Sequence, residues 1–276
     1  MESKIWFITG VSSGLGKALA EAVIDKGDFV IGTFRNQQQV DAFNILHAGK
    51  AHAIRLDISN AEDVQQAFHW VNKQFGRLDF LVNNAGYGLA GSVEETSIEE
   101  VREIFEVNFF GVLQVTQKFL PLFRKQRSGH ILQISSHGGF KAFAGFGIYN
   151  ASKFGLEGFS EALAQEIAPL GIRLTIVEPG PLRTEFAGAS FRLAQKVIEN
   201  YYTTAGVFRE RIKQVDGKQE GDPIKAAQAI ISITTLEHPP LRLPLGKVAI
   251  LSLTTKIEQL QNEINTFKQL AESVVY

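Results

Sequence analysis

Short apolar runs alternate along the chain with segments in which apolar residues recur at helical spacing. In the helical segment 61–75, for example, Val64, Ala67 and Val71 share one face. Strands that alternate with helices need crossover connections, and uninterrupted apolar runs are typical of strands buried on both faces of a mostly parallel sheet. The strands predicted in this way are 5–8, 29–31, 51–56, 80–82, 129–134, 172–177 and 248–251. The pattern therefore predicts an α/β fold with a seven-stranded sheet, helices on both faces, and a single domain over 1–276.

Two late segments depart from this alternation. Over 185–222, aromatic residues interleave with polar ones between a strand and a helix. A long insertion at such a place is typical of a lid or substrate-binding element, and a helical hairpin that only packs against the body remains the alternative. The segment 255–276 is predicted to be a C-terminal helical extension, with a surface or oligomer contact as its expected role.

Three glycines follow the first predicted strand, in the run Thr9-Gly10-Val11-Ser12-Ser13-Gly14-Leu15-Gly16. Glycines at a strand-to-helix junction let backbone N–H groups approach a pyrophosphate, and the helix N-terminus adds partial positive charge. The spacing is Gly-x-x-x-Gly-x-Gly rather than the commoner Gly-x-Gly-x-x-Gly, so the turn alone is a weak signal. The dinucleotide contacts predicted here are Gly10, Ser12, Ser13, Gly14, Leu15 and Gly16.

Two other motifs overlap this turn. Gly10 to Gly14 matches the Gly-x-Ser-x-Gly elbow of hydrolases, with Ser12 as the nucleophile. However, no predicted strand precedes it to carry an oxyanion loop, and the late histidine, His238, lies beside two prolines. Gly16-Lys17 hints at a phosphate-binding P-loop, but the spacing is wrong and Ala18 replaces the required hydroxyl.

The end of the second predicted strand indicates which coenzyme is used. In a dinucleotide-binding unit an acidic residue about 20 residues after the glycines grips the ribose hydroxyls, whereas a nearby arginine accommodates a 2′-phosphate. This strand ends without an acidic residue, and Arg35 stands at its end. A guanidinium pairs with phosphate and stacks on adenine. The alternative is a solvated loop arginine, but the glycine turn upstream favours NADP(H) over NAD(H).

Composition narrows the possible partners and location. The chain has 276 residues, a formal net charge of −1 and no cysteine. Near-neutral charge argues against a nucleic-acid partner, which usually requires a basic stripe. Without cysteine there are no disulfides, thiolate nucleophiles or Cys-ligated zinc, and no metal site is expected. The apolar run 5–8 is too short for a signal peptide or a membrane span, so we expect a cytoplasmic protein without a membrane partner.

The catalytic chemistry is indicated by Tyr149-Asn150-Ala151-Ser152-Lys153, which follows Ser135-Ser136. Residues four apart lie on one helix face, so Tyr149 and Lys153 can point into one site. A cation close to a phenol favours phenolate and lowers its pKa, which makes Tyr149 a workable general acid or base. A Tyr-x-x-x-Lys pair by itself is common and more often marks a surface pair.

The order of these motifs resembles the short-chain dehydrogenase/reductase family over about 4–190. The pieces that carry the resemblance are Thr9-Gly10-x-x-x-Gly14-x-Gly16, Asp57, Asn83-Asn84-Ala85-Gly86, Asn108, Ser136, Tyr149-x-x-x-Lys153, and Pro179-Gly180 with Thr184. The sequence is most similar to the branch that contains hydroxysteroid- and retinol-dehydrogenase-like enzymes and bacterial carbonyl reductases. The late segment 240–246 also resembles this branch. The resemblance implies a Rossmann-like doubly wound fold and hydride transfer between nicotinamide and a carbonyl or alcohol.

The resemblance also implies residue roles. Tyr149 is the acid/base, Ser136 donates a hydrogen bond to the substrate oxygen, and Lys153 binds the nicotinamide ribose. Asn108 holds a relay water through its backbone. The remaining coenzyme contacts implied are Asp57 and Ile58 beside the adenine, Asn83, Ala85 and Gly86 along the cleft, and Pro179, Gly180 and Thr184 at the carboxamide end. Ser136 is chosen over Ser135 only because of its spacing to Tyr149. The alternative role of Asp57 is that of a helix N-cap.

The substrate and the assembly are less sharply indicated. Phe140, Phe143 and Phe146, with the aromatic residues of 185–222, could wall an apolar pocket, which favours hydrophobic ketones, aldehydes or alcohols over sugars. In a reducing cytoplasm with NADPH in excess, we expect the reaction to run in the direction of reduction. The family resemblance implies a homodimer or homotetramer built on helices at 99–124 and 150–168. The alternative function is that of a non-catalytic NADP(H)-binding sensor or scaffold on the same fold, because proteins that share a fold can differ in function.

Overall fold

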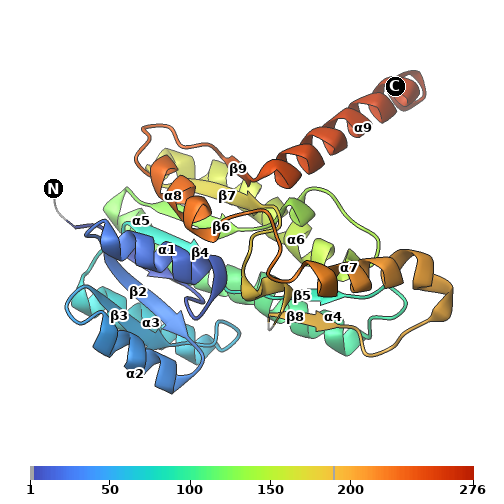
Figure 1. The fold of residues 1–276 in the computed structure, drawn as a ribbon. Helices are drawn as coiled ribbons and strands as arrows, with labels where there is room; N and C mark the ends of the chain where they lie inside the picture. Colours follow the sequence, from blue (N-terminus) through green and yellow to red (C-terminus); the bar gives the residue numbers. More distant parts are fainter. Residues whose placement is uncertain (1–2, 189) are drawn as a thin grey trace.

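Seven parallel strands form one sheet in the order β3-β2-β1-β4-β6-β7-β9 in the computed structural model, which describes residues 3–188 and 190–276 (Figure 1). The strands are β1 Ile5–Ile8, β2 Phe29–Phe34, β3 Ala51–Arg55, β4 Phe80–Asn83, β6 His130–Ile134, β7 Arg173–Pro179 and β9 Arg242–Leu245. The strand order reverses between β1 and β4. In open parallel sheets, ligands bind outside the carboxyl ends of the strands at such a reversal. The predicted Rossmann-like single domain is confirmed.

Helices cover both faces of the sheet. One layer holds α1 Gly14–Asp25, α2 Gln37–Leu46 and α8 Pro223–Ile233, and the other holds α3 Ala61–Gln74, α5 Val112–Gln126 and α6 Gly147–Ile167. Side chains of β1 alternate between the two cores, with Phe7 in one and Trp6 and Ile8 in the other. The apolar residues of β1 are buried on both faces, as its unbroken apolar run predicted.

The last predicted strand was wrong. Residues 248–251 begin the long helix α9 (Lys247–Glu272), and the seventh strand is β9, just before it. A four-residue apolar run does not distinguish a strand from the start of a helix. Pro244 also makes the sequence of β9 resemble a loop, so this strand was not predicted. This proline is tolerated because β9 pairs only with β7 and so lies at the sheet edge.

The insertion at 185–222 is more than a helical hairpin. It contains β8 (Phe191–Leu193), which pairs in parallel with β5 (Gly88–Ala90), and α7 (Val207–Val215). A buried ion pair between Arg209 and Glu95, 2.8 Å long, ties α7 to the body. Residue 189 of this insertion lies outside the described residues.

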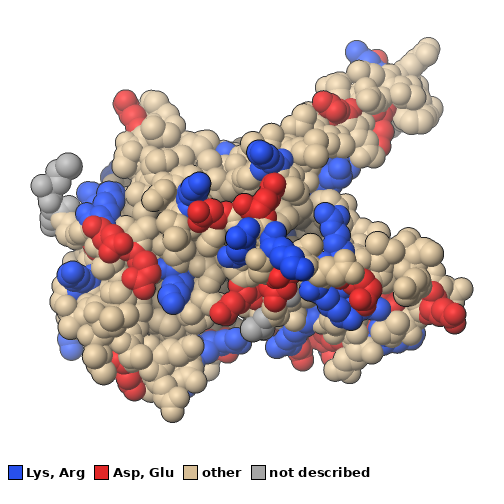
Figure 2. Space-filling view, viewed as in Figure 1, with Lys and Arg blue, Asp and Glu red and all other residues tan. Residues whose placement is uncertain are grey.

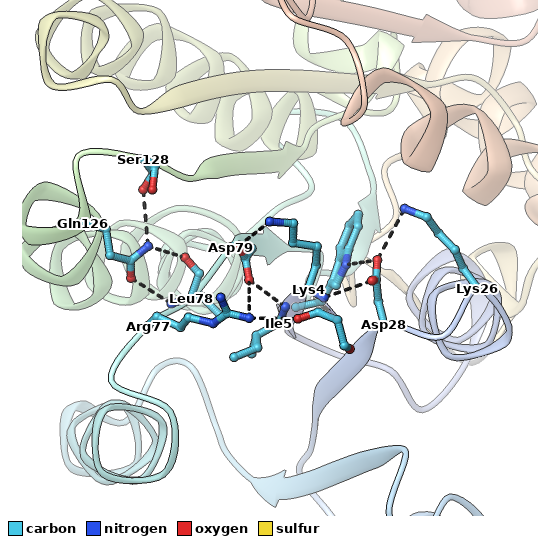
Figure 3. Close-up of polar contacts among 11 residues, drawn as sticks. Lys4, Ile5, Lys26, Asp28, Arg77, Leu78, Asp79, Gln126 and Ser128 are labelled. Atoms are coloured by element: carbon cyan, nitrogen blue, oxygen red, sulfur yellow. Dashed lines mark hydrogen bonds and ion pairs between the residues drawn. The ribbon is translucent and has the colours of Figure 1, made fainter. Parts of the chain in front are cut away.

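The amino edge of the sheet is held by two carboxylates (Figure 3). Asp28 accepts hydrogen bonds from the backbone N–H of Lys4 (3.0 Å) and the indole N–H of Trp6 (3.1 Å). Asp79 accepts one from the backbone N–H of Ile5 at 2.9 Å. These contacts fix the start of β1 at the edge opposite the glycine turn.

Figure 2 shows acidic and basic side chains interspersed over the visible face of the molecule. Among the described residues, no helix has the length and apolar character needed to cross a membrane.

Candidate active site

The glycine turn lies between β1 and α1 at the carboxyl edge of the sheet. Gly10 has φ +71° and Gly14 has φ +61°, which favour glycine, and a Cβ on Gly10 would lie 3.1 Å from Cα of Ala85. Asn84, which sequence reasoning did not place in the site, donates hydrogen bonds from its amide to the backbone carbonyls of Thr9 (2.9 Å) and Gly10 (2.8 Å). The turn is therefore held in shape by the strand next to it.

The N-terminus of α1 fits a phosphate group. The first N–H groups of a helix have no intrahelical acceptor. In the described chain, the Ser13 side chain makes no capping hydrogen bond and the first turn carries no acidic residue. A Cβ on Gly16 would collide with the Asn84 amide and the Gly10 carbonyl. The backbone at Ser12 to Gly16 is thus open to an anion and unsuited to larger side chains.

The second strand brings Arg35 to the same edge. Arg35 is exposed immediately after β2, while Thr33 accepts a hydrogen bond from the Gly10 N–H at 3.1 Å. Burial raises the pKa of Tyr87, and the charges of Arg192 and Arg35 oppose that rise. Because β2 is parallel to β1 and ends at Phe34, Arg35 lies at the same carboxyl edge of the sheet as the glycine turn.

Asp57 and Ile58 differ in their surroundings. The carboxylate of Asp57 accepts hydrogen bonds from the N–H (3.0 Å) and the hydroxyl (2.6 Å) of Ser59. Asn60 caps α3, so Asp57 is not the N-cap that the alternative reading considered. Ile58 is buried and packs closely on Gly111.

The segment after β4 divides into core and cleft residues. The amide of Asn83 is buried and donates to Thr116 (2.9 Å) and Gln133 (3.0 Å), so this side chain serves the interior of the fold. Ala85 packs against Gly10 at the turn. A Cβ on Gly86 would lie 3.0 Å from Asn108 Oδ1 and 3.7 Å from Lys153 Nζ. Gly86 therefore borders Asn108 and Lys153.

Tyr149 and Lys153 lie on the buried face of α6, only 3% and 5% exposed. The Lys153 ammonium donates to the backbone carbonyl of Ile134, at the end of β6, at 2.9 Å. A Cβ on Gly138 would lie 3.3 Å from Ser136 Oγ and 3.5 Å from Tyr149 Cε1, so the serine hydroxyl and the tyrosine ring both border this glycine. Ser135 instead donates to Glu157 at 2.6 Å. The geometry thus places Ser136, and not its neighbour, with the tyrosine.

The pKa of Tyr149 differs from the sequence expectation. Burial raises it above the ordinary phenol value, the hydrogen bond with Ser136 lowers it, and the Glu157 charge adds to the rise. Burial also lowers the pKa of Lys153 to about 8, against an opposing effect of Glu157. The expected lowering of the tyrosine pKa by the lysine is therefore not present in this structure, because burial is the largest effect and the charge of Glu157 acts in the same direction.

Asn108 lies in a π-helical segment, Glu106–Gly111, between α4 (Ile98–Phe105) and α5. Single π-helical turns occur frequently at functional sites. The fully buried Asn108 side chain accepts from the N–H of Tyr87 (3.0 Å), and donates to its carbonyl (2.9 Å) and to Ser152 (3.2 Å). It therefore links the loop after β4 to the catalytic helix.

The last predicted coenzyme contacts follow β7. A Cβ on Gly14 would lie 3.4 Å from Cβ of Thr184, so this threonine lies against the glycine turn. The N–H of Gly180 donates to the carbonyl of Leu245 at 2.8 Å, which joins the Pro179-Gly180 turn to β9.

A charged cluster behind the catalytic helix was missed from the sequence. Arg242 on β9 forms ion pairs with Glu157 (2.6 Å), Glu161 (2.5 Å) and Glu178. Glu157 lies one turn after Lys153 and binds Ser135, so the cluster supports both catalytic segments. The signal available was a carboxylate at the helical spacing Tyr149, Lys153, Glu157.

Aromatic side chains surround Tyr149. Phe146 stacks on its ring with centroids 4.1 Å apart, and Phe186 lies edge-on at 5.9 Å. Phe191 and Phe208 from the insertion contact Phe146 in turn. A groove of about 640 Å³ lies between 92–94, 143–147 and 201–205; Phe143 of this group lines it, whereas Ser136 and Tyr149 do not. Of the predicted wall, Phe143 and Phe146 belong to this group, whereas Phe140 packs under the guanidinium of Arg242.

A dinucleotide-type turn and a Ser-Tyr-Lys group at one sheet edge define an α/β oxidoreductase. The model of the short chain dehydrogenase family matches residues 4–194. The oxidoreductase BOA17 of Botryotinia fuckeliana is 39% identical over 90% of both chains, and a 3-ketodihydrosphingosine reductase of Bacteroides thetaiotaomicron is 36% identical over 89% of both. A short-chain dehydrogenase from Streptomyces avermitilis superposes with a TM-score of 0.92, at 38% identity, over 99% of both chains. The chain belongs to the short-chain dehydrogenase family. Solved structures of similar fold, from Burkholderia phymatum and of ElxO, contain NAD and NADP.

Proposed function

We propose that this protein is an NADP(H)-dependent reductase of hydrophobic ketones or aldehydes. The observation that carries the proposal is that the Ser136 hydroxyl and the Tyr149 ring both border Gly138, beneath an apolar aromatic wall. Phosphates would be held at Ser12 to Gly16, a 2′-phosphate by Arg35, the ribose by Lys153 and the carboxamide by Thr184. The bound coenzyme supplies the hydride; the remaining chemistry belongs to the protein.

In reduction, negative charge grows on the carbonyl oxygen of the substrate. Preorganised donors aimed at this oxygen are usually the largest catalytic contribution. Ser136 donates a hydrogen bond there, and Tyr149 transfers its hydroxyl proton to the oxygen. The high pKa of Tyr149 keeps it protonated before the reaction. Lys153, with a pKa of about 8, and the backbone of Asn108 lead the replacement proton to the phenol.

The aromatic wall supports an apolar substrate. Phe146, Phe186 and Phe191 leave the two hydroxyls as the polar groups over which a carbonyl can sit. The insertion 185–222 acts as the lid, since its Phe186, Phe191 and Phe208 complete this wall. One relative is named a reductase of a ketone, 3-ketodihydrosphingosine. These observations together favour ketones with long apolar groups.

A series of straight-chain methyl ketones tests the substrate class. Burying each additional CH₂ contributes about 0.8 kcal/mol, so kcat/KM with NADPH should rise about threefold to fourfold per carbon until the ketone extends beyond the aromatic wall. The matched control is the same ketone with a terminal hydroxyl, which should lose most of this gain. If kcat/KM does not depend on chain length, the apolar assignment is wrong.

The proposal includes assembly and location. We propose a homodimer or homotetramer through α5 and α6, supported by the exposed Phe110 and Phe154 on and beside these helices. Phe154→Glu should lower the mass measured by light scattering, and an unchanged mass would count against this interface. The cytoplasmic location expected from the sequence is part of the proposal, and cell fractionation tests it.

A further inference from the structure

Helix α9 leaves the body of the molecule and projects into solvent (Figure 1). Within it, Ala249, Ser252 and Leu253 are buried against the body. Beyond Leu253 the large apolar side chains are exposed: Ile257 55%, Leu260 39%, Ile264 61%, Phe267 59% and Leu270 69%. In proteins, most of the stability of a helix comes from packing of its apolar face. An apolar face of this kind indicates a binding surface.

The apolar positions follow a heptad repeat. Alternating steps of three and four residues connect Ile250, Leu253, Ile257, Leu260, Ile264, Phe267 and Ala271. This spacing is the a/d pattern of a coiled coil, and it continues to Val274 after the helix. Because Leu253 is buried against the body, two heptads of this pattern, 257–263 and 264–270, are free to face a second copy. In the exposed part, isoleucine occupies a at 257 and 264, and Leu260 and Phe267 occupy d. Isoleucine at a with leucine at d favours two strands in a parallel coiled coil. The exposed part, 257–271, is about 22 Å long.

Charge at the flanking positions selects the orientation. In this register Glu263 is at position g and Lys268 at the following e, the pair that meets between chains in a parallel dimer. Two copies would therefore form two Glu263–Lys268 pairs across the seam. An antiparallel pair in the register that aligns all these positions brings Glu263 against Glu263 of the second copy. Charge complementarity thus favours a parallel arrangement.

We propose that α9 pairs in parallel with α9 of a second copy of this chain, forming a two-stranded coiled coil outside the catalytic body. This contact is separate from α5 and α6, and it does not depend on the reaction assigned above. The two interfaces together would join dimers into larger assemblies.

Cross-linking tests the pairing directly, because the chain has no cysteine of its own. In the full chain, Ala271→Cys places one thiol at an a position, facing its copy across the seam. Asn262→Cys places the matched control at f, on the outside. Under mild oxidation, non-reducing gels should show mainly covalent dimer for Ala271→Cys and monomer for Asn262→Cys. Monomer for both, or equal cross-linking of both, overturns the proposal.

Charge exchange provides an independent readout of the orientation. In the Ala271→Cys background, Glu263→Lys should reduce the rate of dimer formation, and adding Lys268→Glu should restore it. No change in either variant contradicts the parallel register. If Ala271→Cys stays monomeric while the protein floats with phosphatidylcholine–phosphatidylserine vesicles, the apolar face binds lipid and the proposal is overturned.

Discussion

Replacing Glu95 by glutamine should release the lid from the body. The Glu95 carboxylate accepts hydrogen bonds from the N–H groups of Ile198 (2.9 Å) and Ser92 (2.8 Å) and pairs with Arg209. Burial raises the pKa of Glu95, but these donors outweigh burial and hold it at about 2. A carboxyl pKa lowered from 4.5 to about 2 corresponds to about 3 kcal/mol, since each pKa unit is worth about 1.4 kcal/mol. Glu95→Gln also leaves the buried Arg209 guanidinium unpaired.

The matched control is the neighbouring Glu94→Gln. Glu94 is exposed and accepts a hydrogen bond from the Tyr201 hydroxyl, so its replacement should cost less than about 1 kcal/mol. Urea unfolding and limited proteolysis of 190–215 at pH 7 measure the two effects. The Glu95 contribution should be complete above about pH 4.5 and disappear as the pH falls toward 2, because the folded pKa is the lower one. Equal stability and equal cleavage of both variants would refute this account of lid docking.

Three further substitutions test separate parts of the molecule. Arg35→Ala should raise KM for NADPH at least tenfold and leave KM for NADH nearly unchanged. The control variant Arg55→Ala, on the neighbouring strand, should change neither KM. Equal effects of Arg35→Ala on both coenzymes would contradict the assignment of Arg35 to the 2′-phosphate. Asp79→Ala removes the acceptor for the Ile5 N–H and should lower the free energy of unfolding by about 1–3 kcal/mol with kinetics unchanged. Glu157→Gln removes a charge that raises the pKa of Lys153, so the fall in kcat/KM near pH 8 should move to lower pH. If the pH dependence of kcat/KM does not change, the charge of Glu157 does not act on Lys153.

The sequence predicted the overall fold more accurately than it predicted the last strand and helix, β9 and α9. Alternating apolar runs and helical periods placed six of the seven strands, because burial on both faces leaves an uninterrupted apolar signal. The edge strand β9 escaped this reading, since its Pro244 is typical of a loop and the apolar start of α9 imitates a strand. Hydrophobicity alone cannot separate these cases over four residues.

Local spacing also predicted the core of the candidate site. Tyr149 and Lys153 share a helix face because they are four residues apart, and their separation from Ser136 is set by one loop. The roles of Asn84 and Arg242 could not be predicted in this way. Each acts on a segment distant in sequence, and only the folded sheet brings Arg242 to Glu157 or Asn84 to Gly10. The pKa of Tyr149 likewise depends on burial that local spacing does not reveal.

The most direct test of the account is NADPH-dependent reduction of a long-chain ketone by Tyr149→Phe. The exchange removes the hydroxyl and keeps the ring that stacks on Phe146. Proton transfer of this kind contributes about 10²–10⁴-fold, so kcat should fall by at least about 100-fold while the dissociation constant for NADPH stays unchanged. Turnover within about twofold of the wild type, with the same coenzyme affinity, would contradict the assignment of Tyr149 as the proton donor.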